Sequence, residues 1–145
     1  MSVQVKDIMI KDVITIDHSK SVSDVAKIMD KKKVGCVVVL KDGSPTGIVT
    51  ERDLIRRVLA KNRNPAETKV SEVMSTPLIS VRPELSVLVA AQEMSERKIR
   101  RLAVVEDGKL VGIITSFDLA KHLGEVTNLM VAAILRGMKL GSLMG

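Results

Sequence analysis

Residues Gly47–Leu54 read GIVTERDL, and residues Gly112–Leu119 read GIITSFDL. These two stretches are 65 residues apart, and with the same shift of 65 residues Val5–Leu54 aligns without a gap on Val70–Leu119. Sixteen of the 50 aligned positions are identical, whereas ordinary composition gives roughly one chance match in fifteen. The chain therefore contains a duplicated unit, and this duplication decides the architecture.

Each copy carries signals for a strand, a helix, two further strands and a final helix. In the first copy, the β-branched run Val13–Ile16 predicts a strand, and Ser21 predicts the N-cap of a helix. The apolar run Cys36–Leu40 predicts a buried strand, Asp42-Gly43 predicts a hairpin turn, and Thr50 predicts the cap of the last helix. The second copy repeats these signals over Leu78–Val81, Ser86–Arg97, Leu102–Val105, Val111–Ile114 and a helix from Thr115 through His122.

One unit of this size buries too little surface to be stable alone, so the two copies are expected to pack sheet to sheet around a pseudo-twofold axis. The predicted fold class is therefore α/β, with two tandem β-α-β-β-α repeats. We place the first repeat at residues 1–62, a linker at 63–69 and the second repeat at 70–123. Residues 124–145 form a helical tail, because Gly124 is expected to end the last repeat helix.

The composition excludes several classes of protein. One cysteine and two histidines without ligand spacing predict neither a disulfide framework nor a metal site. A single aromatic residue argues against a base-stacking surface for single-stranded nucleic acid. The first residues lack a long apolar region, so a cytoplasmic location is expected. The scarcity of Asn and Gln is typical of proteins from thermophiles, and a net charge of +6 favours anionic partners.

The Thr-x-x-Asp spacing at the start of each last helix has two interpretations. A Thr N-cap with an acidic residue three positions later explains it locally, through capping and the helix dipole. Alternatively, Gly47 and Gly112 leave room for a ligand beside the helix start, where free amides favour phosphate. A carboxylate can accept hydrogen bonds from both hydroxyls of a ribose, which would assign Asp53 and Asp118 to that role.

Several separated motifs resemble the cystathionine-beta-synthase (CBS) domain family, in the tandem arrangement called a Bateman module. They are the paired GIVT/GIIT-x-x-DL ends, VKDIM at 5–9, VSEVM at 70–74 and KIRRLAVVEDGKLVG at 98–112. The resemblance extends from Val5 to about Leu123. It implies regulatory binding of an adenosyl ligand, an adenine nucleotide (AMP, ADP or ATP) or S-adenosylmethionine, in two clefts between the copies, with no required cofactor.

The resemblance further implies that each cleft combines residues of both copies, with the segment around Arg100 and Arg101 serving both. The first cleft, built on the second-copy helix, would comprise Thr15, Lys20, Val34, Gly35, Cys36, Arg100, Arg101, Ile113, Thr115, Ser116, Phe117 and Asp118. The second cleft, built on the first-copy helix, would comprise Ile48, Thr50, Arg52, Asp53, Ser80 and Ile99.

The chain departs from the family pattern at positions that make the clefts unequal. Gly35 and Cys36 replace basic residues in the first copy, so the Asp53 cleft is expected to lack that phosphate anchor, with Arg52 and Arg56 as candidate substitutes. Phe117 stands where Arg52 stands in the other copy. Unequal affinities, with a single occupied site as one outcome, are therefore expected. A solvated strand edge is the alternative interpretation of the basic pair that follows Ile99.

The tail lies outside the duplication and predicts association. Leu129–Leu135 is apolar on every side, so a helix there must be covered, and it is too short to span a bilayer. Small residues recur every four positions, at Ala133, Gly137, Gly141 and Gly145, a pattern typical of close helix packing. A homodimer or a docking helix for an unknown protein partner is expected. An interfacial membrane helix and packing over the chain's own module are the alternatives.

Three classes of function compete at this point. The leading hypothesis is a ligand sensor that acts in trans on a partner. A nucleic-acid-binding regulator, suggested by the positive charge, lacks a recognisable motif, and a docking scaffold without ligand is a further alternative. An enzyme is not expected, because no nucleophile–base pair, metal set or paired acids can be assigned.

Overall fold

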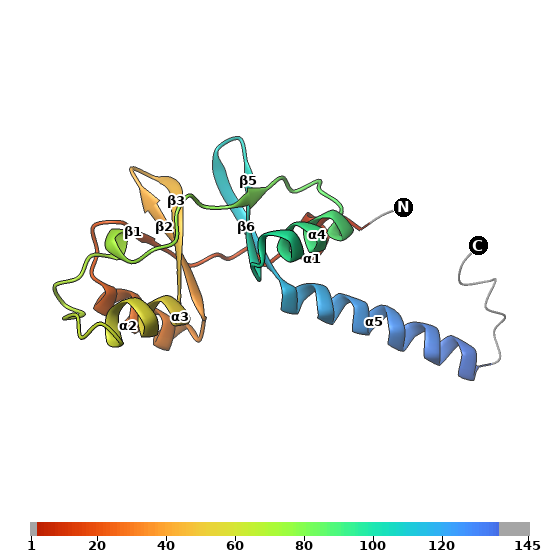
Figure 1. Cartoon of the computed structure of the whole chain (residues 1–145). Coiled ribbons are helices and arrows are strands. Elements are labelled where there is room, and N and C mark those ends of the chain that lie inside the picture. Colours follow the sequence, from red (N-terminus) through yellow and green to blue (C-terminus); the bar gives the residue numbers. More distant parts are fainter. Residues whose placement is uncertain (1–2, 137–145) are drawn as a thin grey trace.

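The computed structural model describes residues 3–136, which form two three-stranded sheets with flanking helices (Figure 1). The first copy contains β1 (Thr15–Asp17), α2 (Val22–Lys32), β2 (Cys36–Lys41), β3 (Ser44–Thr50), α3 (Glu51–Leu54) and the π-helical turn η1 (Ile55–Leu59). The second copy contains β4 (Ser80–Val81), α4 (Val87–Arg97), β5 (Arg101–Glu106), β6 (Lys109–Thr115) and α5 (Ser116–Leu135). Two short segments precede the copies, α1 (Val5–Ile8) and the 3-10 turn η2 (Val70–Glu72). The predicted order of elements and the α/β class are confirmed.

The two sheets share topology and register. The first strand of each copy pairs in parallel with the second, and the second pairs antiparallel with the third. Val38 faces Ile48 across β2 and β3, and the equivalent Ala103 faces Ile113 across β5 and β6. The strand register of the two sheets therefore follows the alignment of the duplicated sequence.

Local capping explains where the first helix of each copy begins and ends. Ser21 Oγ accepts a hydrogen bond from the Asp24 amide at 3.1 Å, as the N-cap pattern predicts. Ser86 takes the same place before α4. Both helices end in a left-handed residue, Lys33 with φ 57° and Lys98 with φ 55°, a conformation that stops helical hydrogen bonding.

The segment before each copy packs into the core of the other copy. Val5 in α1 is fully buried in the second-copy core, and its amide donates to the Leu85 carbonyl at 2.7 Å. Val70 is fully buried in the first-copy core, and its amide donates to the Lys20 carbonyl at 2.9 Å. Neither folded unit is therefore continuous in sequence, and the two are interlocked.

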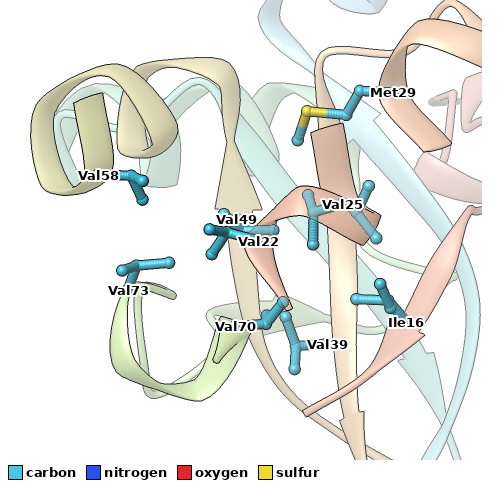
Figure 2. Close-up of a cluster of buried hydrophobic side chains, with 10 residues drawn as sticks. Ile16, Val22, Val25, Met29, Val39, Val49, Val58, Val70 and Val73 are labelled. Carbon is cyan, nitrogen blue, oxygen red and sulfur yellow. The ribbon is translucent and has the colours of Figure 1, made fainter. Parts of the chain in front are cut away.

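The first-copy core is aliphatic, as the near absence of aromatic residues predicts. Figure 2 shows Val70 and Val73, from the segment before the second copy, close to side chains of the first copy. The buried members are Ile16, Val22, Val25, Met29, Val37, Val39, Val49, Val58, Val70 and Val73. The one aromatic residue of the chain, Phe117, is 73% exposed.

The space beside the two glycines that precede the last helices is occupied by the segments that cross from one copy to the other. A Cβ on Gly47 would lie 2.7 Å from Met74 Sδ and 2.9 Å from the Ser75 carbonyl oxygen. A Cβ on Gly112 would lie 2.5 Å from Met9 Sδ. The interpretation that these glycines make room for a ligand is therefore wrong, because a methionine and the neighbouring backbone occupy that space.

The last helix is longer than expected. The prediction that Gly124 ends it is wrong, since α5 continues to Leu135 and extends away from the sheets (Figure 1). From residue 123 onward it exposes large apolar side chains, Leu123, Val126, Leu129, Met130, Val131, Ile134 and Leu135. Of the helices within residues 3–136, none is long and apolar enough to cross a membrane. The predicted glycine stripe at 137, 141 and 145 lies outside the described residues.

Candidate functional site

A cavity of about 720 Å³ lies between the two copies, beside the start of α3. Its walls come from the β3–α3 junction, from the crossing segment that follows Met74, and from the chain that enters β5. The lining residues are Gly35, Ile48, Thr50, Glu51, Arg52, Asp53, Ile55, Arg56, Ser75, Pro77, Leu78, Ile79, Lys98, Ile99, Arg100, Arg101 and Ala103.

Thr50 and Asp53 form a reciprocal cap at the start of α3. The Asp53 amide donates to Thr50 Oγ1 at 3.2 Å, and the Thr50 amide donates to Asp53 Oδ2 at 2.9 Å. Thr115 and Asp118 repeat this arrangement, with distances of 3.2 and 2.8 Å. The capping interpretation of the Thr-x-x-Asp spacing is confirmed in both copies.

The second carboxylate oxygen of Asp53 keeps acceptor capacity. Oδ1 lies 3.8 Å from Arg57 Nε, which is beyond hydrogen-bond distance. The residue is only 9% exposed, and it lines the cavity. Arg57 is itself anchored, because its Nη1 donates to the Val73 carbonyl at 2.7 Å. Asp53 is therefore a fixed acceptor that can take hydroxyl hydrogen bonds without losing its cap.

The charge of the cavity wall is predominantly positive. Two carboxylates, Glu51 and Asp53, line the cavity. Across the part of the chain that the structure describes, no basic side chain of this wall lies within 4.0 Å of a carboxylate oxygen. These basic residues are Arg52, Arg56, Lys98, Arg100 and Arg101.

Gly35 lies where the two copies approach each other at the cavity. A Cβ at this position would lie 2.8 Å from Glu51 Oε1 and 3.5 Å from Arg101 Nη2. The next residue, Cys36, is half-buried. Burial raises the pKa of the Cys36 thiol, and the nearby Arg101 guanidinium opposes that rise. The thiol is therefore kept protonated and poorly reactive at neutral pH.

The cavity gathers most of the residues expected in the Asp53 cleft, namely Ile48, Thr50, Arg52, Asp53 and Ile99. It also contains Arg100 and Arg101, the basic pair of the segment that the resemblance assigns to both clefts. The cause is the path of the chain into β5, which brings that segment beside α3.

Other expected residues lie elsewhere. Ser80 lines a separate hollow of about 540 Å³ with Arg82 and Glu84. Within residues 3–136, most of the set expected around Asp118 does not line the 720 Å³ cavity, and its binding role stays a prediction. Gly35, Arg100 and Arg101 of that set line the cavity, and the members that do not are Thr15, Lys20, Val34, Cys36, Ile113, Thr115, Ser116, Phe117 and Asp118.

Sequence reasoning missed the segment from Ser75 to Ile79 and the basic residue Lys98. The segment reaches the cavity because Ser75 and Ile48 exchange backbone hydrogen bonds of 2.8 and 3.1 Å. The repeated VKDIM and VSEVM motifs were the available signal. Their periodicity, however, does not tell which copy each one packs against.

Comparisons with known proteins agree with this architecture. The family model described as CBS domain matches residues 5–60 and 70–125. A CBS domain-containing protein of Bacillus subtilis, YhcV, is 40% identical over 116 residues, which cover 80% of this chain and 82% of the relative.

Solved structures extend the agreement to three dimensions. A hexameric CBS-CP12 protein from bloom-forming cyanobacteria has a TM-score of 0.78 and 36% identity, and the match covers 83% of this chain and 67% of that one. A CBS domain pair solved in complex with 5′-methylthioadenosine and S-adenosyl-L-methionine has a TM-score of 0.76 and 32% identity, over 86% of this chain and 98% of that one.

Proposed function

Because this chain belongs to the CBS-domain family and carries two such domains, we propose that it is a regulatory sensor of an adenosyl ligand bound in the Asp53 cavity. CBS pair proteins are regulatory modules rather than catalysts as a class. The proposed output is a change in the relative position of the two copies, which a partner protein reads.

The observation that carries this proposal is the composition of the cavity wall. One buried carboxylate, Asp53, suits the hydroxyls of a ribose, and basic side chains beside it suit phosphate. Apolar side chains in the same wall suit the face of an adenine ring; they are Ile48, Ile55, Leu78, Ile79 and Ala103. The complex of a neighbouring CBS pair with two adenosyl compounds supports the ligand class.

The path of the crossing segment supports a role in sensing. Ser75 pairs with Ile48 of the first copy, and the chain then lines the cavity as far as Ile79 before entering the second sheet. A ligand in the cavity therefore contacts both copies and the connection between them. Binding that favours one relative position would shift the population of the module toward it.

Association of the module is a further part of the proposal. The homodimer expected from the sequence stays a prediction, and the hexameric cyanobacterial neighbour supports assembly of CBS pairs into oligomers. The exposed apolar side chains of α5 support the same expectation.

Isothermal titration with adenosine, AMP, ATP and S-adenosylmethionine tests the proposal through a matched pair of variants. Asp53→Asn and Asp118→Asn remove the same charge from equivalent caps. We expect Asp53→Asn to weaken binding by about tenfold or more, because one charge-assisted bond contributes roughly 1.5–3 kcal/mol. Asp118→Asn should leave binding unchanged. If none of the four compounds binds, or if only Asp118→Asn weakens binding, the proposal is wrong.

A further inference from the structure

We propose that the Asp53 cavity selects adenosine nucleotides that carry a chain of phosphates, ADP or ATP, over neutral or cationic adenosyl compounds. This inference rests on the proposed function and adds the charge class of the ligand. The neighbouring pair was solved with 5′-methylthioadenosine and S-adenosyl-L-methionine, two adenosyl compounds without phosphate.

The basic side chains come from two walls, and one phosphate group is too small to use them all. Arg52 and Arg56 are four residues apart, a spacing that places side chains on one face of a helical segment. Lys98, Arg100 and Arg101 come from the other copy, where the chain enters β5. A linear chain of phosphates can contact cations of both copies at once.

The cavity offers little negative charge of its own to offset these cations. Two carboxylates, Glu51 and Asp53, line it against five basic side chains. Within residues 3–136, two arginines outside the cavity have a carboxylate partner that the cavity cations lack, Arg63 with Glu72 at 2.7 Å and Arg97 with Glu93 at 2.9 Å. The unpaired cations of the cavity repel one another, and phosphate relieves that repulsion. The positively charged sulfonium of S-adenosylmethionine adds to that repulsion.

The duplication supplies an internal comparison. Three of the five basic positions have uncharged residues at the equivalent place in the other copy, namely Phe117, Gly35 and Cys36. The remaining two equivalents are Lys121 and Lys33. The excess of positive charge therefore belongs to the Asp53 cavity and not to the repeat as such.

Titration of the full chain with ATP, AMP, adenosine, S-adenosylmethionine and inorganic triphosphate, at about 50 and about 300 mM KCl, tests this inference. We expect ATP to bind about tenfold or more tightly than adenosine at the lower salt, with the advantage reduced at the higher salt. S-Adenosylmethionine should bind no more tightly than adenosine.

The outcomes separate this inference from the proposed function. Equal affinity for ATP, adenosine and S-adenosylmethionine overturns the charge selection and leaves the sensor intact. Absence of binding by every adenosyl compound overturns both. Binding of inorganic triphosphate as tightly as ATP also overturns both, because the nucleoside would then contribute nothing.

Lys98→Asn and Lys33→Asn form a matched pair of variants. Both residues end a helix in the left-handed conformation, which Asn tolerates, but only Lys98 lines the cavity. We expect Lys98→Asn to weaken ATP binding by about threefold without changing adenosine binding, and Lys33→Asn to change neither. Equal weakening of ATP and adenosine in Lys98→Asn, or weakening of ATP in Lys33→Asn alone, overturns the assignment.

Discussion

At the scale of single residues, two glycines of this chain have opposite effects on packing. Gly47 sits against the Met74 thioether and the Ser75 carbonyl, so its lack of a Cβ permits the crossing segment to pass. Gly124 lies inside α5, where a Cβ would meet no atom within 4 Å. Packing requires a glycine at position 47. Position 124 has room for a side chain, so Gly124 only adds conformational entropy to the unfolded chain.

Alanine at these positions is therefore expected to change stability in opposite directions. Gly47→Ala should lower the free energy of unfolding by roughly 1–3 kcal/mol, because backbone at Ser75 must move. Gly124→Ala should raise it by roughly 0.5–1 kcal/mol. Urea unfolding followed by circular dichroism measures both. A neutral Gly47→Ala would show that the crossing segment is loosely packed.

The Cys36 thiol gives a prediction with a defined direction in pH. Burial raises its pKa above the ordinary value of 9.0, so the thiolate becomes abundant only at higher pH than for a free cysteine. Stability linked to this group is present below the unfolded pKa and is lost as pH rises through the folded pKa. The rate of iodoacetamide alkylation against pH, with urea-denatured protein as the control, should have its midpoint above 9.0. A midpoint below that of the denatured control would contradict this prediction.

At the scale of elements, the sequence predicts the features that depend on residues close together in the chain. The helix starts at Ser21, Thr50 and Thr115 were predictable, because capping depends on residues three positions apart. The end of α5 was not, since Gly124 is compatible with a helix interior when its neighbours propagate the helix.

The sequence also does not predict that α1 packs in the second-copy core and that the segment at Val70 packs in the first-copy core. Both segments have the same apolar pattern, and both cores accept a valine at the same place. The sequence therefore predicts that each segment is buried but not against which sheet. The cavity inherits this ambiguity, because the segment that follows Met74 forms one of its walls.

Val5→Ala is expected to loosen the second copy rather than the first. Removing two buried methyl groups costs about 2 kcal/mol, the cavity left behind included. Val5 packs with Leu102 and Ile114, so amide exchange should accelerate first in β5 and β6. Hydrogen exchange followed by mass spectrometry of peptides from both sheets measures this effect. Faster exchange confined to β2 and β3 would show that α1 does not belong to the second-copy core.

At the scale of the whole molecule, the interlocked cores couple the stability of the two copies. Each core contains a valine from the segment that precedes the other copy, and β3 also contacts β6 directly. Unfolding of one copy would strip the other of part of its core. The connection that carries this coupling also lines the proposed ligand cavity, so one structural feature serves both cooperativity and sensing.

Thermal unfolding is therefore expected to be one transition, with a calorimetric enthalpy equal to the van't Hoff enthalpy. Val5→Ala and Val70→Ala lie in different cores, yet both should lower the midpoint of that common transition, by roughly 2–4 °C for each kcal/mol lost. A saturating nucleotide should raise the same midpoint, because it binds only the folded pair. Two transitions, each shifted by one variant alone, would mean that the copies unfold independently. The crossing segments would then contribute little to the coupling of the two cores, and a ligand bound beside them could not bias the relative position of the copies.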